Sequence, residues 1–110
     1  MTPEYHILKH HGLGTDITVL VSHIHSLAMA VNLQGMHHAA CDYAHASCSH
    51  GGHELTVMTK KAGNGWKGSK HHTVDLPSAD STDEQRLQSL KSLTEVINAL
   101  SALLEQETPA

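Results

Sequence analysis

The sequence contains no phenylalanine, one tryptophan and two tyrosines among its 110 residues. A hydrophobic core must therefore be built from aliphatic side chains, methionine and alanine rather than from aromatic rings. Apolar residues make up 39% of the chain, and its length suits a single domain with one core. We expect one domain over 1–110, with a linker at 77–82 before the last helix and a flexible tail at 107–110.

Charge and cysteine are also scarce. Only 16% of the residues are charged and the net charge is −4, so overall charge gives no support to a nucleic-acid-binding or membrane-surface protein. Two cysteines are too few for a disulfide scaffold. The most apolar segment, 17–31, contains two histidines and is too short to span a bilayer, and the first residues do not read as a secretory signal. The sequence predicts a cytoplasmic protein with no membrane segment.

Histidine, in contrast, is abundant. Five of the 12 histidines and both cysteines lie between 37 and 53, in the segment HHAACDYAHASCSHGGH. Imidazole and thiolate are the ligands that zinc prefers, although the spacing matches no standard zinc finger. The alanines around 36–46 favour a short helix, on which residues three or four positions apart share a face.

That helix would bring His37 or His38, Cys41 and His45 together, and the chain would then turn back so that Cys48 or a later histidine completes a tetrahedron. The sequence thus predicts a zinc site formed by His37, Cys41, His45 and Cys48. Buried or free thiols among solvated histidines are one alternative interpretation. A disulfide between Cys41 and Cys48 is another, which a reducing cytosol disfavours.

Periodicity in the first half of the chain predicts three elements. Weak alternation over 4–10 suggests a short first strand, ended by the glycines of HGLG. Apolar residues recur at three- and four-residue steps over 17–31, which is typical of one helix face. The possible short helix over 36–46 follows.

In the second half, alternation predicts strands over 54–60 and 71–76, joined by a glycine-rich hairpin loop at 61–69. The closing helix has a leucine stripe that runs from Leu87 to Leu104 and is widened by Val96 and Leu103, which we expect to reach a second surface where a homodimer forms. The order β-α-(α)-β-β-α predicts an α+β fold, with two main amphipathic helices packed on one face of a small antiparallel sheet.

A second candidate site is the loop around the only tryptophan, where basic residues gather without an acid. Such a loop can follow a phosphate backbone and stack on a base, or contact a protein through the tryptophan. A solvated hairpin is the alternative. The residues concerned are Lys60, Lys61, Trp66, Lys67 and Lys70.

These features together predict a small, non-enzymatic interaction or regulatory protein that binds another macromolecule, with zinc as its cofactor and a protein as its partner. A nucleic-acid-binding module that uses the 60–72 loop is an alternative. A small metal-dependent enzyme is another, for which Asp42 and Glu54 are the nearby carboxylates. No nucleophile motif is visible in the sequence.

Overall fold

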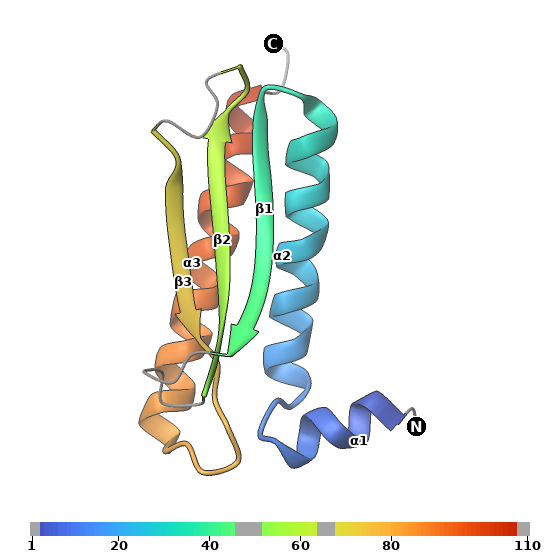
Figure 1. The fold of residues 1–110 in the computed structure, drawn as a ribbon, viewed down its shortest axis with the longest axis vertical. Coiled ribbons are helices and arrows are strands. Elements are labelled where there is room, and N and C mark those ends of the chain that lie inside the picture. Colours follow the sequence, from blue (N-terminus) through green and yellow to red (C-terminus); the bar gives the residue numbers. More distant parts are fainter. Residues whose placement is uncertain (1–2, 46–51, 64–67, 108–110) are drawn as a thin grey trace.

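The structure, a computed structural model, describes residues 3–45, 52–63 and 68–107. Three strands form one antiparallel sheet in the order β1-β2-β3. The long helices α2 and α3 pack against each other on one face of this sheet, and the opposite face is open (Figure 1). The α+β class is confirmed. The elements are α1 (Pro3–His10), α2 (Thr15–Gln34), β1 (His37–His45), β2 (His53–Lys61), β3 (Lys70–Asp75) and α3 (Asp83–Glu107).

The segment 4–10, expected to be a strand, is the helix α1. The alternation over these seven residues is too weak to separate the two periods, and the charges agree with a helix. Glu4 lies in the first turn while Lys9 and His10 lie in the last, where each complements the helix dipole. No residue of α1 is fully buried, and the helix projects from the lower end of α2, away from the sheet (Figure 1).

The expectation of a short helix over 36–46 is also wrong, because His37–His45 is the strand β1. It pairs with β2 along its whole length, from His37 opposite Lys61 to His45 opposite His53. Pairing with a strand that lies later in the sequence overrides the helix propensity of its alanines. The order of elements is therefore α-α-β-β-β-α.

The core lies between the sheet and the two long helices. Alternate residues of β2 and β3 point inward, and regularly spaced residues of α2 and α3 meet them. The centre of this layer consists of Ile17, Ile24 and Val31 from α2, Leu55, Val57 and Val74 from the sheet, and Leu93, Val96 and Leu100 from α3.

Two polar contacts fix the helices to the rest of the fold. The Asn32 side chain donates to the carbonyl of Ala39 at 2.8 Å and accepts from its amide at 2.9 Å, which pairs the outer edge of β1 at that point. Arg86 of α3 donates to the carbonyls of Gly12 and Ser78 at 2.8 and 3.2 Å. Gly12 has a φ of 83°, and a Cβ there would meet the Ser78 carbonyl oxygen at 2.4 Å, so this close approach requires glycine.

The assignment of Val96 to a second surface is wrong. Val96 is 2% exposed and belongs to the core, while Leu103 is partly buried against it. Leu87, expected on the core face, is instead 66% exposed. The buried stripe of α3 begins further along the helix than its leucine pattern suggests.

We predict that Leu93→Ala or Leu100→Ala lowers the free energy of unfolding by about 2–5 kcal/mol, because each leucine is fully buried and leaves a cavity. Leu87→Ala, a change of the same size at an exposed position, should cost less than about 0.5 kcal/mol. Urea unfolding followed by circular dichroism measures all three. Equal effects at positions 87 and 100 would contradict the core described above.

Candidate functional site

The structure does not bring the predicted zinc ligands together. His37, Cys41 and His45 lie four residues apart on one strand, which at about 3.3 Å per residue separates neighbours by about 13 Å. Cys48 lies outside the described residues. Within 3–45, 52–63 and 68–107, no group of three or more histidine, cysteine, aspartate or glutamate side chains could hold a metal ion.

The protonation of Cys41 is also unfavourable for coordinating a metal ion. Partial burial raises the pKa of its thiol, which disfavours the thiolate that coordinates zinc. Zinc binding and the cytoplasmic location stay predictions from the sequence. The four-residue spacing that suggested the ligand set applies to a helix and does not apply to a strand.

Part of the predicted basic cluster does come together. Lys60 and Lys61 end β2, Lys70 begins β3, and all three line a shallow pocket of about 160 Å³ beside Leu103. Trp66 and Lys67 lie outside the described residues. Adjacent strand residues point to opposite faces, so Lys60 and Lys61 do not present one continuous basic stripe.

The opposite end of the sheet holds a contact that the sequence analysis missed. His53, the first residue of β2, is 8% exposed and points inward beside Leu55 and Val57. Its Nδ1 is hydrogen-bonded to the hydroxyl of Tyr43, and its Nε2 lies 3.1 Å from the carbonyl oxygen of Pro77. The sequence contained a signal for this burial, because His53 is in phase with the inward-pointing residues Leu55 and Val57 of the strand.

The partners of His53 define where its proton lies. The Pro77 carbonyl can only accept, so Nε2 carries the hydrogen and donates it. In the neutral ring Nδ1 then accepts from the Tyr43 hydroxyl. Partial burial raises the pKa of Tyr43, so its phenol keeps the proton that it donates.

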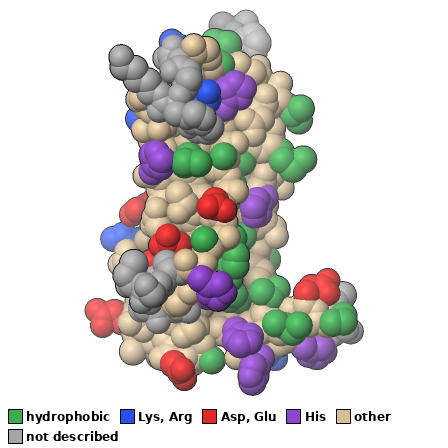
Figure 2. Space-filling model, in the orientation of Figure 1, with side chains coloured by type: hydrophobic (Ala, Val, Ile, Leu, Met, Phe, Trp, Pro, Cys, Tyr) green, Lys and Arg blue, Asp and Glu red, His purple; other side chains and the backbone are tan. Residues whose placement is uncertain are grey.

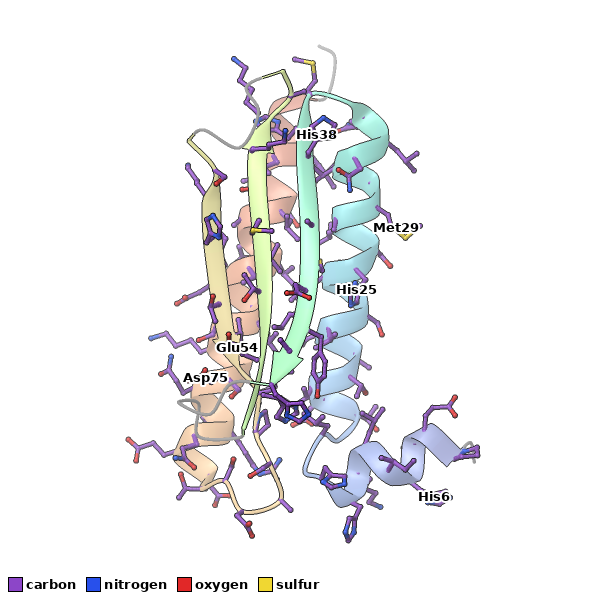
Figure 3. All side chains as sticks on the ribbon, in the orientation of Figure 1. His6, His25, Met29, His38, Glu54 and Asp75 are labelled. Carbon is purple, nitrogen blue, oxygen red and sulfur yellow. The ribbon has the colours of Figure 1, made fainter. Side chains whose placement is uncertain are left out.

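Tyr43 lines two pockets. The first has a volume of about 380 Å³ and the second about 290 Å³, and both are lined by Leu8, Leu13 and Tyr43. The carboxylates considered for an enzyme are not among the lining residues of either. Asp42 and Glu54 belong instead to the open face of the sheet, where Figure 3 shows Glu54 beside Asp75.

The outer face of α2 is the other unusual feature. No aspartate, glutamate, lysine or arginine occurs between Ile17 and Gln34, although only one face of the helix is buried. Val19, Met29 and Leu33 are exposed, and Met29 extends away from the sheet (Figure 3). Figure 2 shows hydrophobic side chains along this flank and on α1. The residues 19, 22, 26, 29 and 33 are called the α2 seam below.

The same composition makes α2 long and apolar enough to cross a membrane. Four of its residues nevertheless lie in the core, and core helices of water-soluble proteins share these properties. Comparisons with protein families, curated proteins and solved structures found no significant match to this chain.

We predict that Tyr43→Phe lowers the free energy of unfolding by about 1–3 kcal/mol, because it leaves Nδ1 of the buried His53 without its donor. Chemical denaturation compares this variant with the wild-type protein. A Tyr43→Phe protein as stable as the wild type would contradict the contact with His53.

Proposed function

We propose that this chain is a small, non-enzymatic interaction protein that binds through the α2 seam, and that the first partner of this seam is a second copy of the chain. The observation that carries the proposal is a solvent-exposed helix face without a charged residue from Ile17 to Gln34. Exposed apolar side chains on an uncharged helix face, here Val19, Met29 and Leu33, are typical of interaction sites.

The spacing of the seam fits a second helix. Its residues follow at steps of three, four, three and four, which is the repeat of side chains that pack between two helices. Ser22 and Ser26 are small and lie between Val19 and Met29, so a second helix can approach closely at the middle of the seam. The flanking residues His23 and His25 place no acid or lysine beside it.

The direction of α1 supports an antiparallel pair. α1 projects from the beginning of α2 on the side of the molecule where Met29 is exposed (Figures 1 and 3). In an antiparallel pair, α1 of each copy lies across the end of the other copy's α2, where Leu33 and Met36 are exposed. In a parallel pair the two α1 helices would compete for one end. In the antiparallel pair, the exposed side chain of Ile7 on α1 contributes apolar area to each of the two contacts.

Charge at the helix ends agrees with this direction. The last turn of α2 has no basic residue, so its carbonyl groups keep their partial negative charge. The antiparallel arrangement brings Lys9 and His10 of the second copy's α1 toward those carbonyls. A dimer thus brings positive charge to a helix end that has no basic residue in its own last turn.

We predict that the protein sediments as a dimer at micromolar concentration and that Leu33→Lys converts it to a monomer. The substitution places a charge in the seam at a residue that is 85% exposed in the single chain, so the fold should be unaffected. Leu87→Lys is the matched control, because Leu87 is also an exposed helical leucine and lies on α3. It should remain a dimer.

Sedimentation velocity over a hundredfold range of concentration distinguishes these outcomes. A monomeric wild-type protein throughout that range, or dissociation by Leu87→Lys alone, would overturn the proposal. Flotation with lipid vesicles tests whether the apolar helix face binds a membrane instead of a second copy of the chain. Flotation that Leu33→Lys abolishes, with a monomer in solution, would assign the seam to a membrane instead.

A further inference from the structure

The two pockets beside Tyr43 form a second site, which has only Ser22 in common with the α2 seam. Their shared walls are apolar, from Leu8 of α1 and Leu13 of the turn that follows it, and Ile17 and Val21 continue the apolar lining in the second pocket. Together they have the size and the character of a small-molecule site, in which a few polar groups orient an otherwise apolar ligand.

The polar side chains that line the first pocket are His11, Tyr43, His45, His53 and Ser78, and three of them donate their hydrogens to other groups of the protein. The Tyr43 hydroxyl donates to Nδ1 of His53, and Nε2 of His53 donates to the Pro77 carbonyl. Nδ1 of His45 lies 3.2 Å from the Gly52 carbonyl and donates to it, which leaves Nε2 of the neutral ring with a lone pair. The Tyr43 oxygen and Nε2 of His45 are thus acceptors.

Donation to His53 also makes the Tyr43 oxygen a better acceptor, because hydrogen bonds in a chain polarise one another. These two acceptors favour a ligand that supplies a hydrogen, while Ser78 and His11 of the same pocket can each donate one. No aspartate, glutamate, lysine or arginine lines either pocket, so neither an ammonium group nor a carboxylate meets a permanent opposite charge. A carboxylate would in addition oppose the two acceptors. The complementary head group is a neutral hydroxyl, which donates to these acceptors and can accept from Ser78 or His11.

We propose that the pocket beside Tyr43 binds a small neutral molecule with an apolar body and one hydroxyl group, of the alcohol or phenol class. The apolar body lies against Leu8 and Leu13, and the hydroxyl donates to the Tyr43 oxygen, with Nε2 of His45 as the neighbouring acceptor. Leu33 lines neither pocket, so Leu33→Lys protein should bind the same ligands.

Three probes of one shape test this chemistry on the full chain: 4-methylphenol, its methyl ether 4-methylanisole, and 4-methylbenzoate. Titration followed by amide chemical shifts should move Leu13, Tyr43 and His45 with 4-methylphenol. Its dissociation constant should be about three- to tenfold lower than that of the ether, which has no hydrogen to donate. The benzoate should bind more weakly than either.

A variant that fills the pocket provides the second measurement. Leu8→Trp adds an indole at a residue that lines both pockets, and it should weaken 4-methylphenol at least tenfold. Leu87→Trp makes the same change at an exposed position of α3 and should leave binding unchanged. Equal affinity for the phenol and the ether, no shifts around Tyr43, or full binding by Leu8→Trp would each overturn the proposal.

Discussion

Nine residues of β1 pair in antiparallel register with nine residues of β2, and this pairing determines where the predicted zinc ligands and Tyr43 lie. It holds 37–45 extended, which spreads His37, Cys41 and His45 along the strand instead of gathering them. It also places Tyr43 opposite Leu55, two residues from His53, so that the phenol reaches the buried imidazole. The apolar pockets beside Tyr43 follow from that contact and from the position of α1.

The outer face of α2 is a consequence of the same architecture. A three-stranded sheet offers one face for two long helices, and α2 packs against both β1 and α3. Its inward residues Ile17, Ile24 and Val31 serve these contacts, while nothing in the described part of the chain covers the seam on the other side. A second helix that packs on the seam would bury it, and this burial explains why the seam carries no charge.

The sequence predicted correctly the elements whose own side chains follow a clear period. The helical stripe over 17–31, the alternating strands over 54–60 and 71–76 and the closing helix agree with α2, β2, β3 and α3. The elements that it predicted wrongly are α1 and β1. The alternation over 4–10 is too weak to exclude a helix, and β1 is specified by a partner strand that local propensity does not include.

The candidate sites follow the same division. The zinc ligands depended on a helix at 36–46, so they lost their common face when that segment proved to be a strand. The Tyr43–His53 contact joins two strands that are separated in the sequence. The only sequence signal for it is that His53 alternates in phase with Leu55 and Val57, which indicates that His53 is buried. A signal for the α2 seam was present in the sequence. No charged residue occurs from Ile17 to Gln34, so the exposed face of this helix lacks charge as well as the buried face.

Self-association through an antiparallel α2 seam is tested most directly by isotope-filtered nuclear Overhauser spectroscopy. In an equal mixture of ¹³C-labelled and unlabelled chains, we expect intermolecular contacts between the methyl groups of Val19 and Leu33. These two residues are about 21 Å apart along α2 in one chain, so the contact arises only between copies. Intermolecular contacts of Leu33 with Leu33, of Leu103 alone, or none at all would contradict this arrangement.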